Sequence, residues 1–495
     1  MAGPASVRGP MNFTEDVLNA FPAARIALVA VDEAGDRRKW GFGELAARSA
    51  GLAGALEARG IGRGDVVLML IGNRAEWVLS MLACFRVGAV ALPCNTQLRR
   101  ADLAHRISVA GPAIALGEER YLGELPDGVP YMTLDEIHEV LDEERPQAPP
   151  ARPAQLDPGD PALIVFTSGT TGSARAAVHS QSYLIGQRTQ AEHWFGARDG
   201  ELAWCTAATG WSKSARNSFI APWLGGAAAY LHEGRFDPGE RLAICEREGI
   251  NVLCQAPTEY RILARRTELR PVPSLRRLVS AGEPLNAEVI RAFREQMGMD
   301  IHDGYGQTET GALTGASIGA EIRDGSMGLP LPGIELRIDD GELVLRAASC
   351  PTFFSHYVGA APFADEWWRT GDLVTADRDG YLWFEGRGDD VIVSSGYRIG
   401  PFEVESALLT HPAVSEAAAV AAPDPERGSV VRAVVVLRSG QPGDALAAEL
   451  QEHVKAVTAP YKYPRIVEFA DSLPKTASGK IKRAQLRGDG STEGG

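Results

Sequence analysis

Residues 237–266 decide the fold class and read DPGERLAICEREGINVLCQAPTEYRILARR. Asp237 followed by proline is typical of a helix N-terminus, and Gly249 is typical of the end of that helix. The short apolar run 251–255 then predicts a strand, and 258–266 predicts the next helix. Strands that alternate with helices in this way indicate a mainly parallel sheet covered by helices.

The same alternation continues to residue 303. Strands are predicted at 275–281 and 299–303, on either side of a helix at 287–297 that ends before Gly298. Ligands of such sheets bind beside the carboxyl ends of the strands. We therefore expect the binding site at the glycine-bearing loops that follow three predicted strands, at 167–172, 282–284 and 304–306.

Length, charge and cysteine usage exclude several classes of protein. A chain of 495 residues predicts two or three domains. The net charge of −14 disfavours a general nucleic-acid-binding protein, because such proteins are usually basic. The six cysteines form no C-x-x-C pair and no cluster with histidine, which is typical of reduced, buried thiols. No apolar run reaches the roughly 18 residues of a membrane helix, and a signal-peptide pattern is absent. We expect a cytoplasmic protein without a membrane span.

The pattern divides the chain into a large and a small unit. Residues 328–386 predict a β-rich subdomain, and the proline-rich stretch 146–161 predicts an exposed connection. Residues 401–470 predict a separate α+β unit, with a helix at 402–409, strands at 414–420, 430–437 and 465–469, and a helix whose apolar face carries Leu446, Leu450, Val454 and Val457. The expected organisation is an α/β N-terminal domain at 12–386 with helix-covered sheets, a hinge at 387–389, a small mobile α+β domain at 390–487, and disorder at 1–11 and 488–495.

A loop rich in hydroxyl groups and glycine follows the apolar residues 164–166. It reads Thr167, Ser168, Gly169, Thr170, Thr171, Gly172, and a cation follows at Arg175. Glycines let backbone N–H groups approach a polyanion, and hydroxyls add uncharged donors. The loop therefore suits a triphosphate, although its spacing differs from that of a P-loop. An ordinary Gly/Ser/Thr turn is the alternative.

A second candidate follows the predicted strand at 299–303 and reads Asp303, Gly304, Tyr305, Gly306, Gln307, Thr308, Glu309, Thr310. The tyrosine ring suits a purine, the Thr308 hydroxyl suits a phosphate oxygen, and the Glu309 carboxylate suits Mg²⁺. A surface turn with a solvated glutamate is the alternative.

Further candidates lie toward the C-terminus. Asp372 is expected in a loop between β-like segments, where its carboxylate could hold ribose hydroxyls. Lys480 follows a Ser-Gly turn and could neutralise charge on an acyl-phosphate transition state. Arg387 and Arg398 lie around the predicted hinge. A Gly-Asp turn, solvated arginines and a solvated lysine are the competing interpretations.

Together, these segments resemble the adenylate-forming (AMP-binding) superfamily, and the resemblance covers about residues 12–487. It rests on Tyr305-Gly-Gln-Thr-Glu309, Arg369-Thr-Gly-Asp372 and Ser478-Gly-Lys480, in that order. Within the superfamily, the segments 209–211, 222–223, 281–286 and 459–465 look like those of medium-chain and aromatic acyl-CoA synthetases.

The resemblance implies an AMP-forming acid–CoA ligase that uses ATP, Mg²⁺ and coenzyme A. A small-molecule carboxylic acid would attack the α-phosphate of ATP, giving acyl-AMP and pyrophosphate, and the thiol of coenzyme A would then displace AMP. A ligase that loads a separate acyl carrier protein remains an alternative. So does a degenerate nucleotide-binding protein without turnover, although retention of Thr308, Glu309, Asp372 and Lys480 argues against it. No residue specifically supports a luciferase-like oxidation.

The resemblance also implies a role for each motif residue. Phosphates would lie on Thr167, Ser168, Gly169, Thr170, Thr171, Gly172 and Arg175, and the α-phosphate on Thr308. The nucleoside would lie among Gly282, Glu283, Pro284, Asp303, Gly304, Tyr305, Gly306, Gln307, Asp372, Arg387 and Arg398. Glu309 would hold Mg²⁺, and Lys480 would serve adenylation only. The acyl and CoA pocket would involve Gly210, Trp211, Lys213, Arg216, Gly306 and Gly396, with Asp389 as the hinge of a domain swing.

The chain departs from the family pattern in two places, the phosphate loop and the acyl pocket. Ala174 and Arg175 stand where the phosphate loop usually has Pro-Lys, which predicts weaker or slower ATP handling. Gly306 stands where acetate-restricted relatives carry tryptophan, which predicts an acyl group larger than acetate. Arg216 stands where close relatives often have an apolar residue. Because a buried unpaired arginine is costly, Arg216 is expected to face solvent or the CoA tunnel, or to meet a second polar group on the acid.

Overall fold

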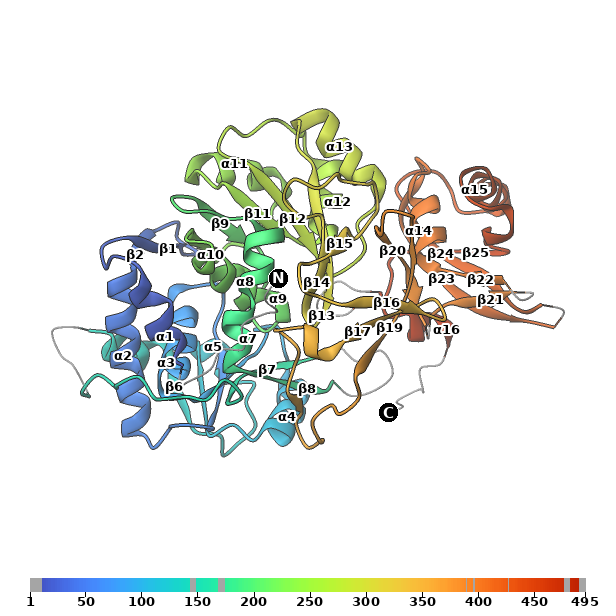
Figure 1. Ribbon diagram of the computed structural model, residues 1–495. Helices are drawn as coiled ribbons and strands as arrows, with labels where there is room; N and C mark the ends of the chain where they lie inside the picture. Colours follow the sequence, from blue (N-terminus) through green and yellow to red (C-terminus); the bar gives the residue numbers. More distant parts are fainter. Residues whose placement is uncertain are drawn as a thin grey trace.

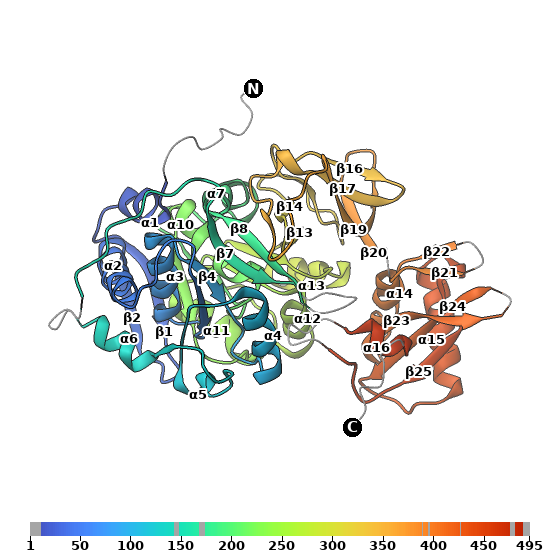
Figure 2. The same ribbon diagram turned by 90° about the horizontal axis from the view of Figure 1, so that it is seen from below.

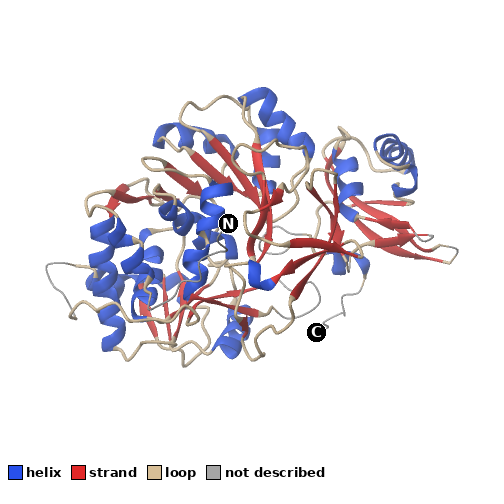
Figure 3. Cartoon of the chain, in the orientation of Figure 1, coloured by secondary structure: helices blue, strands red, loops and turns tan. Residues whose placement is uncertain are grey.

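Two large sheets, a four-stranded sheet and a C-terminal unit make up the computed structural model (Figures 1 and 3). The structure describes residues 11–142, 148–167, 174–388, 390–394, 397–425, 427–475 and 481–488. The first sheet has nine strands in the spatial order β15 (Leu329–Pro330), β14 (Gly311–Gly315), β13 (Ile301–Gln307), β12 (Arg277–Ala281), β11 (Val252–Gln255), β9 (Leu202–Cys205), β10 (Ala228–His232), β1 (Ile26–Val31) and β2 (Arg37–Gly41). Strands from β13 to β1 pair in parallel, while β14, β15 and β2 are antiparallel additions at the edges.

The second sheet has seven strands, and most of them are also parallel. Their order is β18 (His356–Tyr357), β8 (Ala176–Ser180), β7 (Pro161–Phe166), β4 (Val90–Pro93), β3 (Val66–Leu70), β5 (Ile114–Gly117) and β6 (Tyr131–Thr133). Strands β7 to β6 are parallel, and β8 and β18 are antiparallel. The expected helix-covered, mainly parallel architecture is confirmed.

Helices lie between and around the two sheets. They are α1 (Phe13–Asp16), α2 (Phe42–Ala58), α3 (Ala75–Val87), α4 (Arg100–Ala110), α5 (Glu119–Leu122), α6 (Leu134–Val140), α7 (Gln181–Gly186), α8 (Arg188–Gln190), α9 (Ser212–Ala215), α10 (Ala221–Leu224), α11 (Pro238–Glu248), α12 (Pro257–Arg266) and α13 (Ala287–Met297). The largest core cluster combines α2, α3 and α10 with residues of both sheets, such as Met69 and Ala203. A second cluster packs α11–α13 on the other face of the nine-stranded sheet. Helix α13 begins and ends where the sequence predicts, with Gly298 in the left-handed conformation.

The chain continues into a four-stranded sheet and then into the C-terminal unit (Figure 2). The four strands are β16 (Leu336–Asp339), β17 (Glu342–Arg346), β19 (Trp367–Ala376) and β20 (Leu382–Arg387). The C-terminal unit contains β21 (Ile392–Ser394), β22 (Tyr397–Ile399), α14 (Pro401–Leu409), β23 (Val414–Asp424), β24 (Gly428–Leu437), α15 (Asp444–Val457), β25 (Ile466–Phe469) and α16 (Arg483–Arg487). It has its own apolar core, in which Leu450 and Val454 of α15 are buried.

Several local expectations are wrong. Residues 304–306 are not a loop, because β13 continues through them and pairs with β14. Asp372 likewise lies within β19, where it is opposite Arg387 of β20. Val457 is exposed, not on the apolar face of its helix. Met11 is buried and pairs with Leu156 of the proline-rich connection, so it does not belong to a disordered lead. At the other end, Gly488 caps α16.

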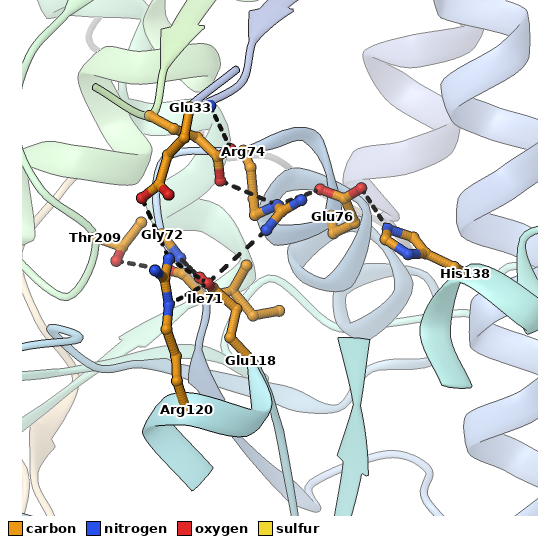
Figure 4. Close-up of polar contacts among 10 residues, drawn as sticks. Glu33, Ile71, Gly72, Arg74, Glu76, Glu118, Arg120, His138 and Thr209 are labelled. Carbon is orange, nitrogen blue, oxygen red and sulfur yellow. Dashed lines mark hydrogen bonds and ion pairs between the residues drawn. The ribbon is translucent and has the colours of Figure 1, made fainter. Parts of the chain in front are cut away.

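An ion-pair network joins the two sheets beyond the carboxyl end of β3 (Figure 4). Arg74 lies 3.0 Å from Glu76, 3.1 Å from Glu233 and 3.8 Å from Glu118, measured between side-chain nitrogen and oxygen. Thr209 donates to the Ile71 carbonyl at 2.8 Å. These contacts tie the loop before α9 to the seven-stranded sheet.

All six cysteines are buried and free, as the sequence predicts. No helix in the described part of the chain is long and apolar enough to cross a membrane.

Candidate active site

A cavity of roughly 1650 Å³ is lined by both the N-terminal sheets and the C-terminal unit. It gathers the predicted residues Thr167, Arg175, Lys213, Arg216, Gly282, Glu283, Pro284, Asp303, Gly304, Tyr305, Gly306, Gln307, Thr308, Glu309, Asp372 and Arg387. From the C-terminal unit, Lys475, Ile481 and Lys482 also line it. Segments that are far apart in the sequence therefore share one cavity.

Some predicted residues are not among its lining residues. Gly210 and Trp211 are described but do not line it, and they lie just before α9. The backbone of Arg398 lies in the β21–β22 hairpin, and its side chain falls outside the described residues. Predictions for Ser168, Gly169, Thr170, Thr171, Gly172, Asp389, Gly396 and Lys480 fall outside the described residues.

Asp372 is the centre of a hydrogen-bonded group at the edge of the β-rich subdomain. Its Oδ2 accepts from the Tyr305 hydroxyl at 2.5 Å and from Gln307 Nε2 at 2.7 Å. Its Oδ1 lies 3.2 Å from Arg387 Nη1. Burial raises the pKa of Asp372, although Arg387 and the hydrogen bonds oppose that shift. The arrangement holds the Asp372 carboxylate in one orientation in the cavity wall.

Glu283 is fixed by α12. Its Oε1 accepts from the backbone N–H and the hydroxyl of Thr258, at 3.1 and 2.6 Å, and its Oε2 accepts from Arg261 at 2.8 Å. Burial alone would raise the pKa of Glu283, but Arg261 and Thr258 hold it below its usual value. Lys213 Nζ lies on the same side and donates to the Ala281 carbonyl at 3.1 Å. The loop after β12 therefore has a defined shape before any ligand binds.

Asp303 is a buried carboxyl with a different environment. It is 4% exposed, and its Oδ1 has no hydrogen-bond partner in the described part of the chain. Burial raises its pKa to about 8. Near neutral pH, the protonated carboxyl of Asp303 can therefore donate a hydrogen bond to a ligand through its hydroxyl and accept another through its carbonyl oxygen.

Glu309 is connected to Arg175 through an aromatic ring. The Tyr357 hydroxyl donates to Glu309 Oε1 at 2.6 Å, and the Arg175 guanidinium lies 3.4 Å from the centre of the Tyr357 ring. No group of three or more His, Cys, Asp or Glu side chains among the described residues could hold a metal alone. A carboxylate beside a phosphate site still fits Mg²⁺, because such ions commonly use one or two carboxylates together with substrate phosphates.

Two glycines permit close contacts around the expected acyl pocket. A Cβ at Gly306 would lie 1.8 Å from the Gly311 carbonyl oxygen, so no side chain fits there with the strands in these positions. Gly210 has a φ of +87°, and a Cβ there would lie 2.3 Å from the Asn95 backbone nitrogen. The loop before α9 can therefore lie directly against Asn95.

Arg216 is 5% exposed and lines the cavity, which contradicts an orientation toward bulk solvent. Its Nε and Nη1 have no acceptor in the described part of the chain.

Sequence reasoning missed Tyr357, Thr258 and Arg261. Tyr357 lies in the two-residue strand β18, which is too short to show a periodicity that could mark it. Thr258 and Arg261 were assigned only to a helix. Their spacing of three residues was a usable signal, because residues i and i+3 share a helix face.

Comparisons with known proteins agree with this geometry. The AMP-binding enzyme family matches residues 14–348, and the AMP-binding enzyme C-terminal domain matches residues 403–480. An uncharacterized acyl-CoA ligase, YtcI of Bacillus subtilis, is 37% identical over 95% of this chain and 94% of its own length. The rat mitochondrial acyl-coenzyme A synthetase ACSM4 is 39% identical over 96% of this chain and 90% of its own. The anthranilate CoA ligase AuaEII, solved with anthranoyl-AMP, is 28% identical with a TM-score of 0.87 and 98% coverage of each chain. The chain therefore belongs to the AMP-binding enzyme family of adenylate-forming enzymes and is similar to acyl-CoA synthetases over nearly its whole length.

Proposed function

We propose that this protein is an ATP-dependent, AMP-forming acid–CoA ligase that acts on a medium-chain or aromatic carboxylic acid. The observation that carries the proposal is the shared cavity in which Glu283, Glu309 and Asp372, from three separate segments, meet residues of the C-terminal unit.

The first half-reaction forms an acyl-phosphate bond. A carboxylate oxygen of the acid attacks the α-phosphorus of ATP, and the bond from that phosphorus to the bridging oxygen of pyrophosphate breaks. Thr308 would contact the α-phosphate, while Tyr305 and Asp372 would hold the nucleoside. Lys480 would offset the charge that develops during this step. No nucleophile from the protein is needed, so catalysis comes from positioning and charge stabilisation.

The second half-reaction forms the thioester. The sulfur of coenzyme A attacks the acyl carbonyl carbon, the bond from that carbon to AMP breaks, and the thiol proton passes to solvent. We propose that residues 390–487 swing about Asp389 between the two half-reactions, so that Lys480 leaves and the segment around Gly396 enters. Such alternation lets one site use two sets of groups in turn.

Magnesium would be held by Glu309 together with phosphate oxygens of ATP, and the ion supplies charge neutralisation at the triphosphate. Tyr357 would orient Glu309 through its hydroxyl. Arg175 would contact the phosphates from the end of the loop that begins at Thr167.

The cytoplasm is the compartment that the reduced cysteines and the soluble substrates favour.

The test is pyrophosphate release from ATP and Mg²⁺ with a panel of carboxylic acids, in the presence and absence of coenzyme A. Acid-dependent release, a thioester product and loss of adenylation in Lys480→Ala are the expected results. Release without a thioester would instead indicate an acyl carrier protein as the acceptor. Nucleotide binding without release for any acid would indicate a binding protein without turnover.

A further inference from the structure

Arg216 is a buried cation at the edge of the acyl pocket. It follows α9 and begins a π-helical turn, Arg216–Ile220, in which the Ala221 N–H donates to the Arg216 carbonyl. Irregular turns of this type often occur at functional sites. Arg216 is only 5% exposed, and it lines the same cavity as Glu309 and Tyr305.

The guanidinium lies beside the glycines that shape the pocket. A Cβ at Gly311 would lie 3.6 Å from Arg216 Nη1, and the Gly311 carbonyl is the group that faces Gly306. Gly306 immediately precedes Gln307 and Thr308, the segment expected to contact the reacting phosphate. Arg216 is therefore close to the space that the acyl group would occupy.

No carboxylate pairs with Arg216 among the residues that the structure describes. Its Nε and Nη1 lack acceptors among the residues that the structure describes. Its electrostatic neighbours are His179 on β8, Tyr183 on α7 and Cys254 on β11. Burial, reinforced by Arg216, lowers the pKa of His179 to about 3, so the imidazole is neutral at physiological pH. Burial raises the pKa of Tyr183, which keeps the phenol neutral as well.

These neighbours also have unused hydrogen-bonding capacity. The two ring nitrogens of His179 are buried without partners in the described part of the chain. The Tyr183 hydroxyl interacts with Arg216 and Gln187, both of which are neutral or cationic partners, so it supplies no negative charge. Unpartnered buried polar groups are unfavourable, and an unpaired buried charge is more so. Of these groups Arg216 lines the cavity, and an apolar acyl chain would leave its guanidinium without an anion. A carboxylate would neutralise the guanidinium and could accept its hydrogen bonds in pairs.

We propose that Arg216 forms an anion subsite in the acyl pocket and that the acid which this enzyme activates carries a second carboxylate. The inference rests on the proposed ligase function and narrows its substrate class. Arg216 acts as a specificity residue that contacts the distal end of the acid, while the other carboxylate attacks ATP.

The experiment compares dicarboxylic acids with monocarboxylic acids of equal length: succinate with butanoate, adipate with hexanoate, and suberate with octanoate. The monomethyl ester of each diacid keeps the length and removes the distal charge. Hydrogen bonds to charged groups predict that kcat/KM for the preferred diacid exceeds that of its partner acid and ester by roughly 10- to 100-fold. Arg216→Leu should lose this preference and gain activity on the monocarboxylate, and Arg216→Lys should keep part of it. Arg270→Leu removes a surface arginine that pairs with Glu246 outside the cavity, and it should keep the wild-type preference.

A binding measurement distinguishes failure of the anion subsite from failure of the ligase function. The preferred diacid should raise the melting temperature of the wild-type protein more than the matched monocarboxylate does, and Arg216→Leu should lose that difference. Turnover of monocarboxylates or esters at rates equal to the diacids would overturn the subsite while leaving the ligase intact. Absence of pyrophosphate release with every acid would refute the ligase. The subsite would then be supported by diacid-specific stabilisation that depends on Arg216, and overturned by its absence.

Discussion

Asp303 shows how a single buried side chain can make stability depend on pH. Its carboxyl has a folded-state pKa of about 8, and burial is the main cause. Because this pKa is raised, the stability that the protonated form provides is complete below the unfolded-state pKa of about 4 and is lost as the pH rises toward 8. Asp303→Asn stays neutral throughout, so its melting temperature should vary less between about pH 5 and pH 8 and exceed that of the wild type at the upper end.

Thermal unfolding of the ligand-free protein across this pH range checks the prediction for Asp303. Asp127→Asn is the matched control, because the Asp127 side chain is fully exposed. Parallel curves for wild type and Asp303→Asn would show that the carboxyl is already ionised at neutral pH.

Substitutions of Tyr357 test whether its contacts with Arg175 and Glu309 support ATP and Mg²⁺ binding. Tyr357→Phe keeps the ring beneath Arg175 and removes the hydroxyl that donates to Glu309. One hydrogen bond is worth about 0.5–1.5 kcal/mol, so the Mg²⁺ concentration for half-maximal activity should rise roughly 2- to 10-fold. Tyr357→Ala also removes the ring and should weaken ATP binding further.

Steady-state titrations of Mg²⁺ and ATP measure both effects of Tyr357. Arg175→Lys and Arg175→Ala complete the set, because they change the cation and leave the hydroxyl in place. If Tyr357→Phe matched the wild type in the Mg²⁺ titration, Tyr357 would have no part in orienting Glu309.

At the scale of the element, helices with a regular apolar spacing could be predicted from the sequence. Strand segments whose conformation depends on pairing with another strand could not. Helix α13 was predicted with its observed bounds, because its apolar residues recur at helical spacing and Gly298 ends it. The extension of β13 through Gly304 and Gly306 was missed, because glycine is typical of turns in the sequence. Pairing with β14 decides the conformation there, and that partner is not visible in local sequence.

In the candidate site, residues within motifs could be predicted from the sequence, whereas the residues that orient them could not. Motif residues such as Glu309 and Asp372 could be listed from the sequence, because each lies in a distinctive segment. Their orienting partners could not, because Tyr357 reaches Glu309 from a different strand and carries no local signal. The burial of Arg216 was likewise set by elements as distant in sequence as β8 and β14.

The ion-pair network around Arg74 and Glu76, beyond β3, should make the stability of the protein decrease at low pH. Burial alone would raise the pKa of Glu76, but the hydrogen bond from His138 and the charge of Arg74 hold it at about 2. Because this pKa is lowered, the stabilisation is complete above about pH 4.5 and is lost as the pH falls toward 2. Glu76→Gln should lose up to about 3 kcal/mol at pH 7.

The melting temperature of Glu76→Gln is compared with that of the wild type between about pH 7 and pH 3.5, and the gap should narrow below about pH 4.5. Glu119→Gln changes an exposed glutamate on α5 and should show no gap. A constant gap at every pH would mean that lost packing, rather than lost ionisation, destabilises the variant.

At the scale of the whole molecule, the contact between the large part and the C-terminal unit includes polar bonds. Arg265 of α12 donates to the Ser415 carbonyl at 2.6 Å, and Asn286 donates to Ser406 of α14 at 2.8 Å. Polar contacts of this kind exchange readily with water, which favours relative motion of domains. The C-terminal unit also has a separate apolar core, so it can move as one body.

Asp389 is the proposed hinge of such motion, and the residues beside it are described. Gly388 donates from its backbone N–H to the Gly371 carbonyl at 2.7 Å, which ties it to the β-rich subdomain. Asp390 pairs with Arg487 of α16 at 2.6 Å, which ties it to the C-terminal unit. The Gly388 backbone and the Asp390 side chain thus contact different parts of the protein, while the Asp390 backbone N–H donates to the Arg387 carbonyl at 3.0 Å.

Proline at this position would restrict rotation. Asp389→Pro fixes φ and also narrows the conformations of Gly388. Pyrophosphate release in the first half-reaction should change little, whereas conversion of preformed acyl-AMP and coenzyme A to thioester should fall by at least about tenfold, because only the second step requires the swing. Single-turnover assays of each half-reaction measure the two effects separately, and Asp389→Ala, which leaves rotation free, should retain both. Equal losses in the two half-reactions would show that the substitution damages the fold, and unchanged thioester formation would place the hinge elsewhere.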